Sequence, residues 1–199
     1  MRVIAGKYRS RILKSLKDLA LRPTSDRLRE TLFNVLGDRV SGSRFVDAFA
    51  GTGAVGIEAL SRGAVDVVFI ENHAPAVALI RRNLESLGVE TGVRVVSADA
   101  VRGLEKLAVQ HKSTDEPVGF VFLDPPYAKA EQYARVLGFL GSTRFLAPGS
   151  LVIAEHHRTL ELPQHFGKLL QTRVLRQGDA ALSFFEWQAT EGEEIPFAA

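Results

Sequence analysis

Two patterns of hydrophobic and polar residues alternate along most of this chain of 199 residues. Short runs of β-branched and aromatic residues are typical of strands, and apolar residues repeated every three or four positions are typical of amphipathic helices. From Ser43 onward, their alternation predicts βαβ units around a parallel sheet. The predicted strands are residues 44–49, 65–70, 93–97, 118–123 and 150–154.

Helix and turn signals complete this outline. Helices are predicted over residues 54–62 and 75–87, and an earlier helix is predicted to begin at Thr24 or Ser25 and end at Gly37. After the last parallel strand, residues 168–176 and 181–187 predict an antiparallel hairpin that closes one edge of the sheet. At the other end of the chain, residues 3–13 predict a basic β-hairpin.

Composition excludes several kinds of chemistry. The chain has no cysteine, so catalysis by a thiolate, a redox-active cysteine pair and a cysteine-bound zinc or iron–sulfur site are excluded. The paired His156 and His157 lack a third nearby metal ligand in the sequence, and we expect no bound metal. No secretory leader and no run of about 18 apolar residues is recognisable, so we expect a cytoplasmic protein without a membrane segment.

Charge is distributed unevenly although the net charge is only +2. Residues 1–44 contain eleven basic and four acidic residues, a net of +7, whereas residues 45–199 contain fourteen basic and nineteen acidic residues, a net of −5. A basic segment of this kind attracts a polyanion, although a solvated basic face would have the same composition.

A glycine-rich loop follows the first predicted strand. Its sequence is Asp47-Ala48-Phe49-Ala50-Gly51-Thr52-Gly53-Ala54-Val55-Gly56, which contains the G-x-G-x-x-G pattern between a strand and a helix. This pattern is typical of nucleotide binding, and Glu71, twenty residues after Gly51, suits the ribose hydroxyls.

Asp47 changes the interpretation of that loop. A carboxylate at its mouth would repel a dinucleotide pyrophosphate but would attract the sulfonium and ammonium groups of S-adenosylmethionine. The alternative is that Asp47 caps a backbone turn. Asp99, just after the third strand, fits recognition of an adenine amino group and an ordinary helix N-cap equally well.

A second motif ends the fourth predicted strand, with the sequence Asp124-Pro125-Pro126-Tyr127. Two prolines fix the backbone and remove two N–H donors, so the free acceptors there suit an exocyclic amine. Asp124 and the Pro125 carbonyl would accept hydrogen bonds from the amine, and Tyr127 would stack on its base. A simple turn at the end of a strand is the alternative.

With these motifs in hand, the chain resembles the class I S-adenosylmethionine-dependent methyltransferases that methylate nitrogen. The segments Ile4-Ala5-Gly6-Lys7, Arg22-Pro23-Thr24-Ser25-Asp26-Arg27-Leu28-Arg29-Glu30 and Gly178-Asp179-Ala180-Ala181-Leu182 narrow the resemblance to the RsmD-like bacterial 16S rRNA (guanine-N2)-methyltransferases. The similarity covers residues 2 to about 187. Gln177 departs from it, because the family has an aromatic residue before this Gly-Asp pair.

The resemblance implies an α/β fold. It is the Rossmann-like class I methyltransferase fold, a doubly wound, mostly parallel seven-stranded sheet with an antiparallel last strand and a small N-terminal β-hairpin extension. Residues 1–20 would form this rRNA-binding extension, residues 21–189 the methyltransferase domain and residues 190–199 an acidic disordered tail. The substrate would be 16S rRNA in an assembled or partly assembled 30S subunit, with S-adenosylmethionine converted to S-adenosylhomocysteine and no obligate protein partner.

The same resemblance assigns residues of this chain to three roles. The donor site would comprise Asp47, Ala48, Phe49, Ala50, Gly51, Thr52, Gly53, Glu71, Asn72, Asp99, Ala100 and Asp124. The target guanine would be held for catalysis by Asp124, Pro125, Pro126 and Tyr127. The rRNA would be contacted by Arg2, Lys7, Arg9, Arg11, Arg22, Thr24 and Arg27.

Four other functions are compatible with parts of this sequence. A DNA methyltransferase acting on adenine N6 or cytosine N4 would use the same motif but usually needs an added target-recognition domain. A protein glutamine methyltransferase normally has Asn where this chain has Asp124. An NAD-dependent oxidoreductase fits the glycine pattern but not Asp47, and a catalytically silent RNA-binding module is the last alternative.

Overall fold

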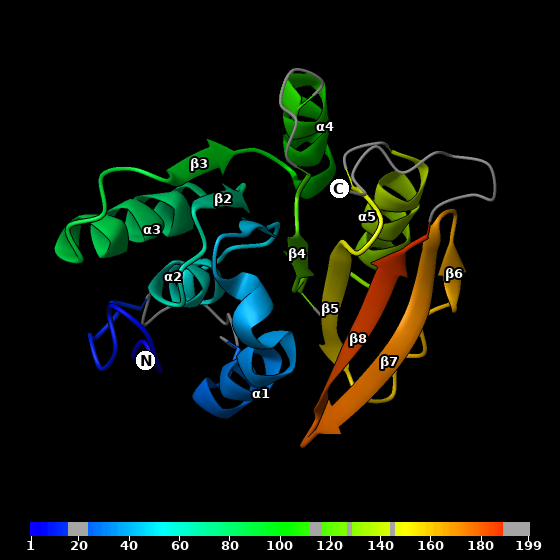
Figure 1. Cartoon of the computed structure of the whole chain (residues 1–199), viewed down its shortest axis with the longest axis horizontal. Coiled ribbons are helices and arrows are strands. Elements are labelled where there is room, and N and C mark those ends of the chain that lie inside the picture. Colours follow the sequence, from blue (N-terminus) through cyan, green and yellow to red (C-terminus); the bar gives the residue numbers. More distant parts are fainter. Residues whose placement is uncertain (16–23, 112–116, 127–128, 144–145, 189–199) are drawn as a thin grey trace, which may run out of the picture.

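The described part of the chain forms an eight-stranded mixed sheet with helices on both faces (Figure 1). The computed structural model describes residues 1–15, 24–111, 117–126, 129–143 and 146–188. The strand order is β3-β2-β1-β4-β5-β8-β7-β6. In chain order the strands are β1 (Arg44–Asp47), β2 (Asp66–Glu71), β3 (Val93–Ser97), β4 (Phe120–Leu123), β5 (Leu151–His157), β6 (His165–Phe166), β7 (Leu169–Gln177) and β8 (Ala180–Trp187).

The parallel part of the sheet confirms the predicted βαβ alternation. Strands β1 to β5 pair in parallel, and β8 lies antiparallel to β5. Strand β7 then pairs antiparallel with β8, so the predicted closing hairpin is confirmed as well. The sheet has one strand more than the seven expected, because the two-residue strand β6 pairs with the start of β7 through His165↔Leu170 and Phe166↔Leu169.

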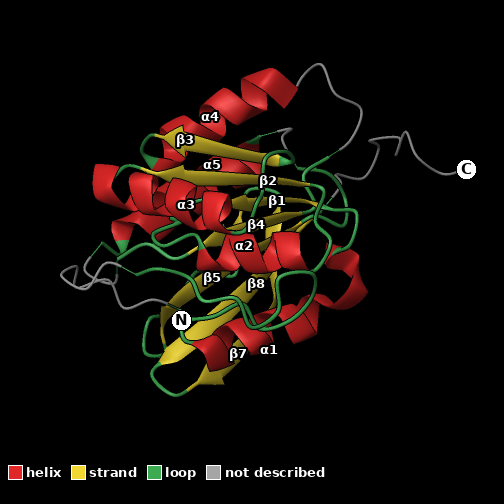
Figure 2. Cartoon of the chain, turned by 90° about the vertical axis from the view of Figure 1, so that its left-hand side faces the viewer, coloured by secondary structure: helices red, strands yellow, loops and turns green. Residues whose placement is uncertain are grey.

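The helices form two layers on opposite faces of this sheet (Figure 2). One hydrophobic cluster joins α1, α2 and α3 to Phe45, Phe69, Phe120 and Phe122, and a second joins α4 and α5 to the opposite face. The helices are α1 (Asp26–Leu36), followed by a 3₁₀ turn (Gly37–Val40), α2 (Ala54–Ser61), α3 (Ala74–Ser86), α4 (Ala100–His111) and α5 (Glu131–Ser142).

The helix ends follow their sequence signals. Ser25 is the N-cap of α1, since its Oγ accepts the Leu28 amide at 3.1 Å, and Gly37 ends the helix with φ 57°. Gly56 lets α2 approach the sheet closely, because an added Cβ would lie 2.3 Å from the Phe69 ring. Within the part of the chain that the structure describes, no helix is long and apolar enough to cross a membrane.

The N-terminal segment, residues 1–13, folds back on itself but makes little regular sheet. Its two arms form one isolated antiparallel bridge, Arg2↔Ile12, and backbone hydrogen bonds join Val3 to Arg11 and Ser10 to Val3. The predicted hairpin is therefore present as a turn with a single bridge. We call residues 1–15 the N-terminal arm, and Figure 1 shows its beginning beside α2.

Candidate active site

Four acidic residues gather at the carboxyl ends of neighbouring parallel strands. Asp47 ends β1, Glu71 ends β2, Asp124 follows β4, and Glu155 lies near the end of β5. The chain leaves β1 toward β2 on one side and reaches β4 on the other, so the strand order reverses between β1 and β4. Crevices at such reversal points, beyond the carboxyl ends of the strands, are where doubly wound sheets bind ligands.

The glycine-rich loop is held in place by Glu71. The Glu71 carboxylate accepts the Gly51 amide at 2.8 Å through Oε2 and the His73 amide at 2.8 Å through Oε1. Gly51 and Gly53 have φ values of 51° and 78°, a conformation that favours glycine. The carboxylate at the predicted ribose position therefore also fixes the turn of the loop.

Asp47 lies beneath the same loop and is 2% exposed. Its Oδ2 accepts the Gly56 amide in the first turn of α2 at 3.0 Å, so the capping contact considered as an alternative is present. Burial raises the pKa of Asp47 to about 7, the Gly56 hydrogen bond opposes this, and the charge of Glu71 adds to it. None of these three influences is a positive charge, so none of them compensates the charge of an ionised Asp47.

The remaining predicted donor-site residues surround this loop. Ala48 and Ala50 are buried, and Phe49 and Thr52 are half-buried. Asn72 is exposed after β2, and Ala100 is buried at the start of α4. Asp99 caps α4, because its Oδ1 accepts the Val101 amide at 3.2 Å and lies 3.9 Å from an Arg135 nitrogen.

The Asp124-Pro125-Pro126 turn begins directly after β4. Pro125 is buried, Pro126 is exposed, and the Pro126 carbonyl accepts the Lys129 amide at 2.8 Å. Asp124 is partly exposed, but loss of hydration followed by the charges of Glu155 and Asp47 raises the pKa of Asp124 well above its usual range. Tyr127, predicted to stack on the base, lies outside the described residues.

Glu155 is a member of this site that the sequence analysis does not identify. It is 5% exposed, and its Oε2 accepts the Thr24 hydroxyl at 2.8 Å. The same hydroxyl lies 3.4 Å from Asp124 Oδ2, so Thr24 touches both carboxylates. The sequence signal was a charged residue inside the apolar strand β5, but only the pairing of β4 with β5 shows what it faces.

Thr24 therefore lies deeper than expected for a residue that contacts RNA, at 7% exposure. Arg27, the second residue of α1, is exposed, and Arg22 lies outside the described residues. His156, the neighbour of Glu155, is buried with its Nε2 at 2.8 Å from the Ser183 hydroxyl. Burial lowers the pKa of His156. Among the described residues, no group of three or more acidic or histidine side chains could hold a metal ion.

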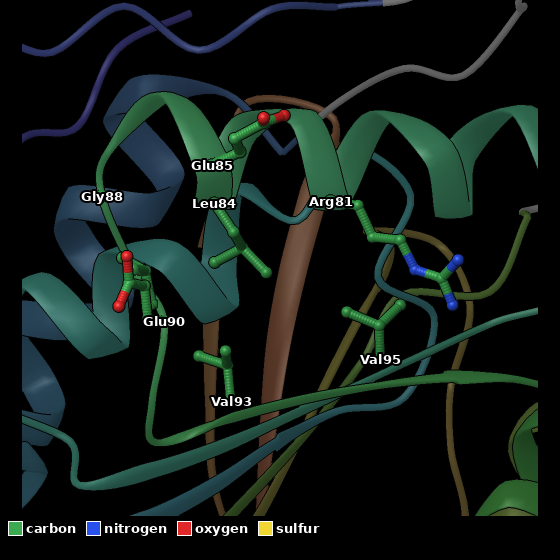
Figure 3. A pocket seen from close by; sticks show the side chains of 8 residues that line it. Arg81, Leu84, Glu85, Gly88, Glu90, Val93 and Val95 are labelled. Atoms are coloured by element: carbon green, nitrogen blue, oxygen red, sulfur yellow. The ribbon is translucent and has the colours of Figure 1, made fainter.

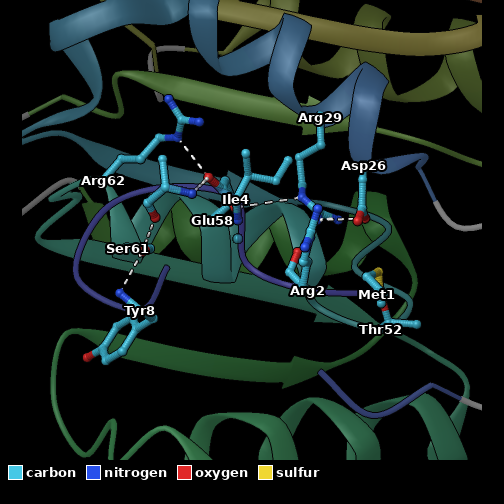
Figure 4. Close-up of polar contacts among 12 residues, drawn as sticks. Met1, Arg2, Ile4, Tyr8, Asp26, Arg29, Thr52, Glu58, Ser61 and Arg62 are labelled. Atoms are coloured by element: carbon cyan, nitrogen blue, oxygen red, sulfur yellow. Dashed lines mark hydrogen bonds and ion pairs between the residues drawn. The ribbon is translucent and has the colours of Figure 1, made fainter. Parts of the chain in front are cut away.

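The basic side chains of the N-terminal arm are exposed, whereas its backbone is anchored. Arg2, Lys7, Arg9 and Arg11 all face solvent. The backbone amides of Ile4 and Ala5 donate to the buried Glu58 of α2 at 2.8 and 3.0 Å (Figure 4). Lys7 donates its amide to the Ser61 carbonyl at 2.7 Å. The arm is thus attached to α2 while its charges remain available.

A shallow groove of about 330 Å³ lies elsewhere, between α3 and β3 (Figure 3). Its lining includes Arg81, Leu84, Glu85, Val93 and Val95. None of the four clustered acids and none of the predicted site residues lines it. The chemistry at the carboxyl edge of the sheet is therefore separate from this groove.

The acidic residues at the carboxyl edge of the sheet fit a cationic ligand better than an anionic one. Asp47 and Glu71 accept amides of the glycine-rich loop and the α2 that follows it, the charge of Glu71 raises the pKa of Asp47, and the charge of Asp47 raises the pKa of Asp124. A positive group placed among them would favour their ionised forms, whereas a pyrophosphate would add to the repulsion. The residues present thus suit the sulfonium and ammonium groups of S-adenosylmethionine.

Known proteins are similar to this chain in both sequence and fold. Ribosomal RNA small subunit methyltransferase D of Escherichia coli K12 is 34% identical over 163 residues, which is 82% of this chain and 78% of that protein. YlbH of Bacillus subtilis is 35% identical over 188 residues, 94% of this chain and 98% of its own length. The solved structure of yhhF from Escherichia coli has a TM-score of 0.79 at 31% identity, covering 96% and 99% of the two chains.

The family model described as Conserved hypothetical protein 95 matches residues 1–186. This match spans the arm, the glycine-rich loop and the Asp124 turn. The resemblance seen in the sequence is thereby confirmed, and the oxidoreductase alternative falls away. The chain belongs to the Conserved hypothetical protein 95 family, the RsmD-like methyltransferases.

Proposed function

We propose that this protein transfers the methyl group of S-adenosylmethionine to the exocyclic N2 of one guanine in the 16S rRNA of the small ribosomal subunit. The observation that carries the proposal is that Asp124 follows β4 next to the end of β1, where the Ala48 amide donates to the Phe122 carbonyl at 2.9 Å and the charge of Asp47 acts on Asp124. Relatives named as ribosomal RNA small subunit methyltransferase D support ribosomal RNA as the substrate. A protein with this substrate would work in the cytoplasm.

In this proposal the chain's own residues position two reactants. Asp47 and Glu71 hold the donor through its cationic and ribose groups, and Asp99 faces its adenine. Asp124 and the Pro125 carbonyl accept hydrogen bonds from the guanine amine and direct its lone pair toward the methyl group. S-adenosylmethionine supplies an electrophilic methyl group and leaves as S-adenosylhomocysteine, so no metal is required.

Attack of the guanine amine on the methyl group depends on the alignment of the two reactants and on the electrostatics of the site. The amine loses its proton as the N–CH₃ bond forms and the S–CH₃ bond breaks, and in this proposal Asp124 accepts that proton. Burial and the charges of Glu155 and Asp47 raise the pKa of Asp124 in the ligand-free protein, and a cationic donor beside it would favour the carboxylate form that accepts the amine hydrogen. The exposed basic residues of the N-terminal arm would hold the rRNA backbone without reading its sequence.

Labelled methyl transfer tests the proposal directly. The enzyme is incubated with methyl-labelled S-adenosylmethionine and, separately, with 30S subunits, naked 16S rRNA, DNA and total protein, and the labelled nucleoside is identified. We expect N2-methylguanosine in 16S rRNA. Label in DNA or protein, without N2-methylguanosine, would overturn the proposal.

Asp124→Ala is the matching variant. Because Asp124 acts on the amine, we expect turnover to fall at least a hundredfold while affinity for S-adenosylmethionine, measured by calorimetry, stays within about threefold. Glu161→Gln, an exposed acidic residue after β5, serves as the control and should behave as wild type. Near-normal turnover by Asp124→Ala would contradict the role given to Asp124.

A further inference from the structure

Asn83 of α3 is a buried amide that holds two separate segments. It is 0% exposed. Its Oδ1 accepts the Lys14 amide at 2.9 Å, and its Nδ2 donates to the Lys14 carbonyl at 3.2 Å and to the Thr52 carbonyl at 3.1 Å. Lys14 belongs to the N-terminal arm, and Thr52 lies between Gly51 and Gly53 of the glycine-rich loop. One side chain therefore ties the arm to the loop.

Only one orientation of this amide pairs all three contacts. An asparagine side chain has two N–H donors on its nitrogen and acceptor positions on its oxygen. Both hydrogens of Asn83 are donated to carbonyl oxygens, and its oxygen accepts a backbone amide. An aspartate would have no donor for the Thr52 carbonyl, and an alanine would have neither a donor nor an acceptor.

The arm meets the same loop residue a second time. The Thr52 hydroxyl lies 3.9 Å from the Met1 sulfur, a weak O–H···S contact (Figure 4). The Leu13 amide donates to the Met1 carbonyl at 3.1 Å, so the two ends of the arm are joined to each other. The basic Arg9 and Arg11 lie between these ends. A polyanion that orders the arm would therefore act on Thr52 through both ends.

Helix α3 supports the loop and the arm within about two turns. An added Cβ at Gly53 would lie 3.2 Å from Ile80, so the loop rests on this helix. Asn83 follows three residues later, and the Ser86 carbonyl, three residues further on, accepts Arg11 Nη2 at 2.7 Å. The loop and the arm thus share one support, and Asn83 is the side chain of α3 that bonds to both.

Contacts of this kind couple two binding sites through conformational order. A ligand that orders a segment loses conformational entropy, and a second ligand that needs the same segment ordered loses less. A donor bound at the loop would fix the Thr52 backbone and, through Asn83, the Lys14 end of the arm. By linkage, an rRNA held by the arm would strengthen donor binding by the same factor.

We propose that Asn83 is a positioning residue that couples the two substrates, so that rRNA at the arm and S-adenosylmethionine at the loop each strengthen the binding of the other. This inference rests on the proposed function. It gives the arm an influence on the donor site in addition to its contact with the rRNA backbone.

Hydrogen exchange in the wild-type protein without RNA is the first test. S-adenosylhomocysteine serves as an unreactive probe, and its binding is confirmed by calorimetry. We expect saturation with this probe to slow exchange of the Lys14 amide by about threefold or more, because that amide donates to Asn83. The Ser41 amide, which donates to the Asp38 carbonyl in the turn before β1, should be unaffected.

Affinity for S-adenosylhomocysteine with and without 30S subunits that lack the modification is the second test. We expect the wild-type protein to bind the probe about fivefold or more tightly on the subunits, and Asn83→Ala to bind it equally in both conditions. Ser86→Ala is the matched control. It removes a hydroxyl that donates to the Asn83 carbonyl at 2.8 Å but keeps the side-chain contacts of Asn83, so it should retain the wild-type ratio.

Three results would contradict this coupling. An unchanged Lys14 exchange rate in wild-type protein that binds the probe would overturn the inference and leave the proposed function standing. Equal affinity of the wild-type protein with and without subunits would do the same, and so would an Asn83→Ala variant that melts as a folded protein and keeps the wild-type affinity ratio. If Asn83→Ala does not fold, the two wild-type measurements decide. If the labelling experiment yields no N2-methylguanosine, the proposed function fails and this inference fails with it.

Discussion

Asp47 is almost fully buried beneath the glycine-rich loop, which is unusual for an acidic residue. Its pKa is about 7 in the folded protein and 3.8 in its ordinary environment. Above pH 7 the folded protein therefore holds a buried charge that the unfolded chain hydrates freely. This difference costs stability on the order of 4 kcal/mol, at about 1.4 kcal/mol per pKa unit.

The sign of the resulting pH dependence follows from linkage. Between pH 7 and about 4 the folded protein binds a proton at Asp47 that the unfolded chain does not, so this group's contribution to the free energy of unfolding increases as the pH falls. The penalty is complete above the folded pKa and disappears below the unfolded one. Donor binding should have the opposite dependence, since a cationic ligand needs the ionised form.

Asp47→Asn separates these two effects. The asparagine oxygen still accepts the Gly56 amide but is never charged, so we expect the ligand-free variant to be more stable than wild type at pH 8, by a few kcal/mol. The difference should shrink toward pH 5, as measured by urea unfolding. Affinity for S-adenosylmethionine at pH 8 should fall at least tenfold.

Asp38 is exposed, so Asp38→Asn is the matched control. We expect it to change neither the stability at pH 8 nor the affinity for S-adenosylmethionine. Equal stability of wild type and Asp47→Asn at both pH values would contradict the burial argument. Unchanged donor affinity would contradict the place given to Asp47 in the donor site.

At the scale of elements, the contact between the N-terminal arm and α2 depends on one buried carboxylate. Glu58 is 0% exposed and accepts Arg62 Nε at 2.8 Å in addition to the amides of Ile4 and Ala5. The buried Arg29 of α1 has its Nε 3.8 Å from Glu58 Oε2 and also donates to the Arg2 carbonyl and to Asp26 (Figure 4). Glu58 thus joins α1, α2 and the arm.

Glu58→Gln should loosen this joint. One amide oxygen replaces two carboxylate oxygens, so one of the arm's amides loses its acceptor, and Arg29 loses a compensating charge in the interior. We expect the free energy of unfolding to fall by about 3 kcal/mol. Hydrogen exchange at the Ile4 and Ala5 amides should accelerate more than exchange in β4.

The control for this variant is Glu30→Gln on the exposed side of α1. It should change stability by less than about 0.5 kcal/mol. If Glu58→Gln left the exchange rates of Ile4 and Ala5 unchanged, the arm would have to be held by its other contacts, which include those with Ser61.

At the scale of the whole molecule, opposite charges are separated between the arm with α1 and the rest of the chain. Residues 1–44 have a net charge of +7, and their described part includes the arm, whose amides bind Glu58 of α2, and Thr24, which touches Asp124. Residues 45–199 have a net charge of −5 and include the four clustered acids. An anionic substrate would therefore be attracted by the arm and not by the carboxyl edge of the sheet. This arrangement suits a clamp that positions RNA while the acidic site receives one base.

Reversing the charge of Arg9 and Arg11 tests this clamp. We expect binding to 30S subunits to weaken at least tenfold at low salt, with the slope of log affinity against log salt reduced by about two, because two phosphate contacts are lost. Affinity for S-adenosylmethionine should not change. Arg11 donates to the Ser86 carbonyl at 2.7 Å, so thermal melting accompanies the measurement.

The matched control reverses Arg102 and Lys106 on α4, which covers the other face of the sheet. Equal weakening by this pair would show a general charge effect. Undiminished 30S binding by the Arg9 and Arg11 variant would contradict the clamp.

The sequence by itself determined the fold class, the positions of the main strands along the chain, and the loop and turn to which the chemistry is assigned. These features are local: strand and helix periodicity, the glycines of the loop and the two prolines after β4 act through the backbone of their own segment. It placed α1 correctly for the same reason, through Ser25 and Gly37. It did not place the α5 helix or the short strand β6.

Only the tertiary structure decided which distant residues meet. Thr24 is 100 residues from Asp124 and 131 residues from Glu155, and no pattern within either segment indicates that one hydroxyl touches both carboxylates. Likewise, Glu58 is at least 53 residues from Ile4 and Ala5, whose backbone amides donate hydrogen bonds to it. Such contacts depend on strand order and helix packing, which bring the segments together. Periodicity along the chain carries no information about which strand ends become neighbours.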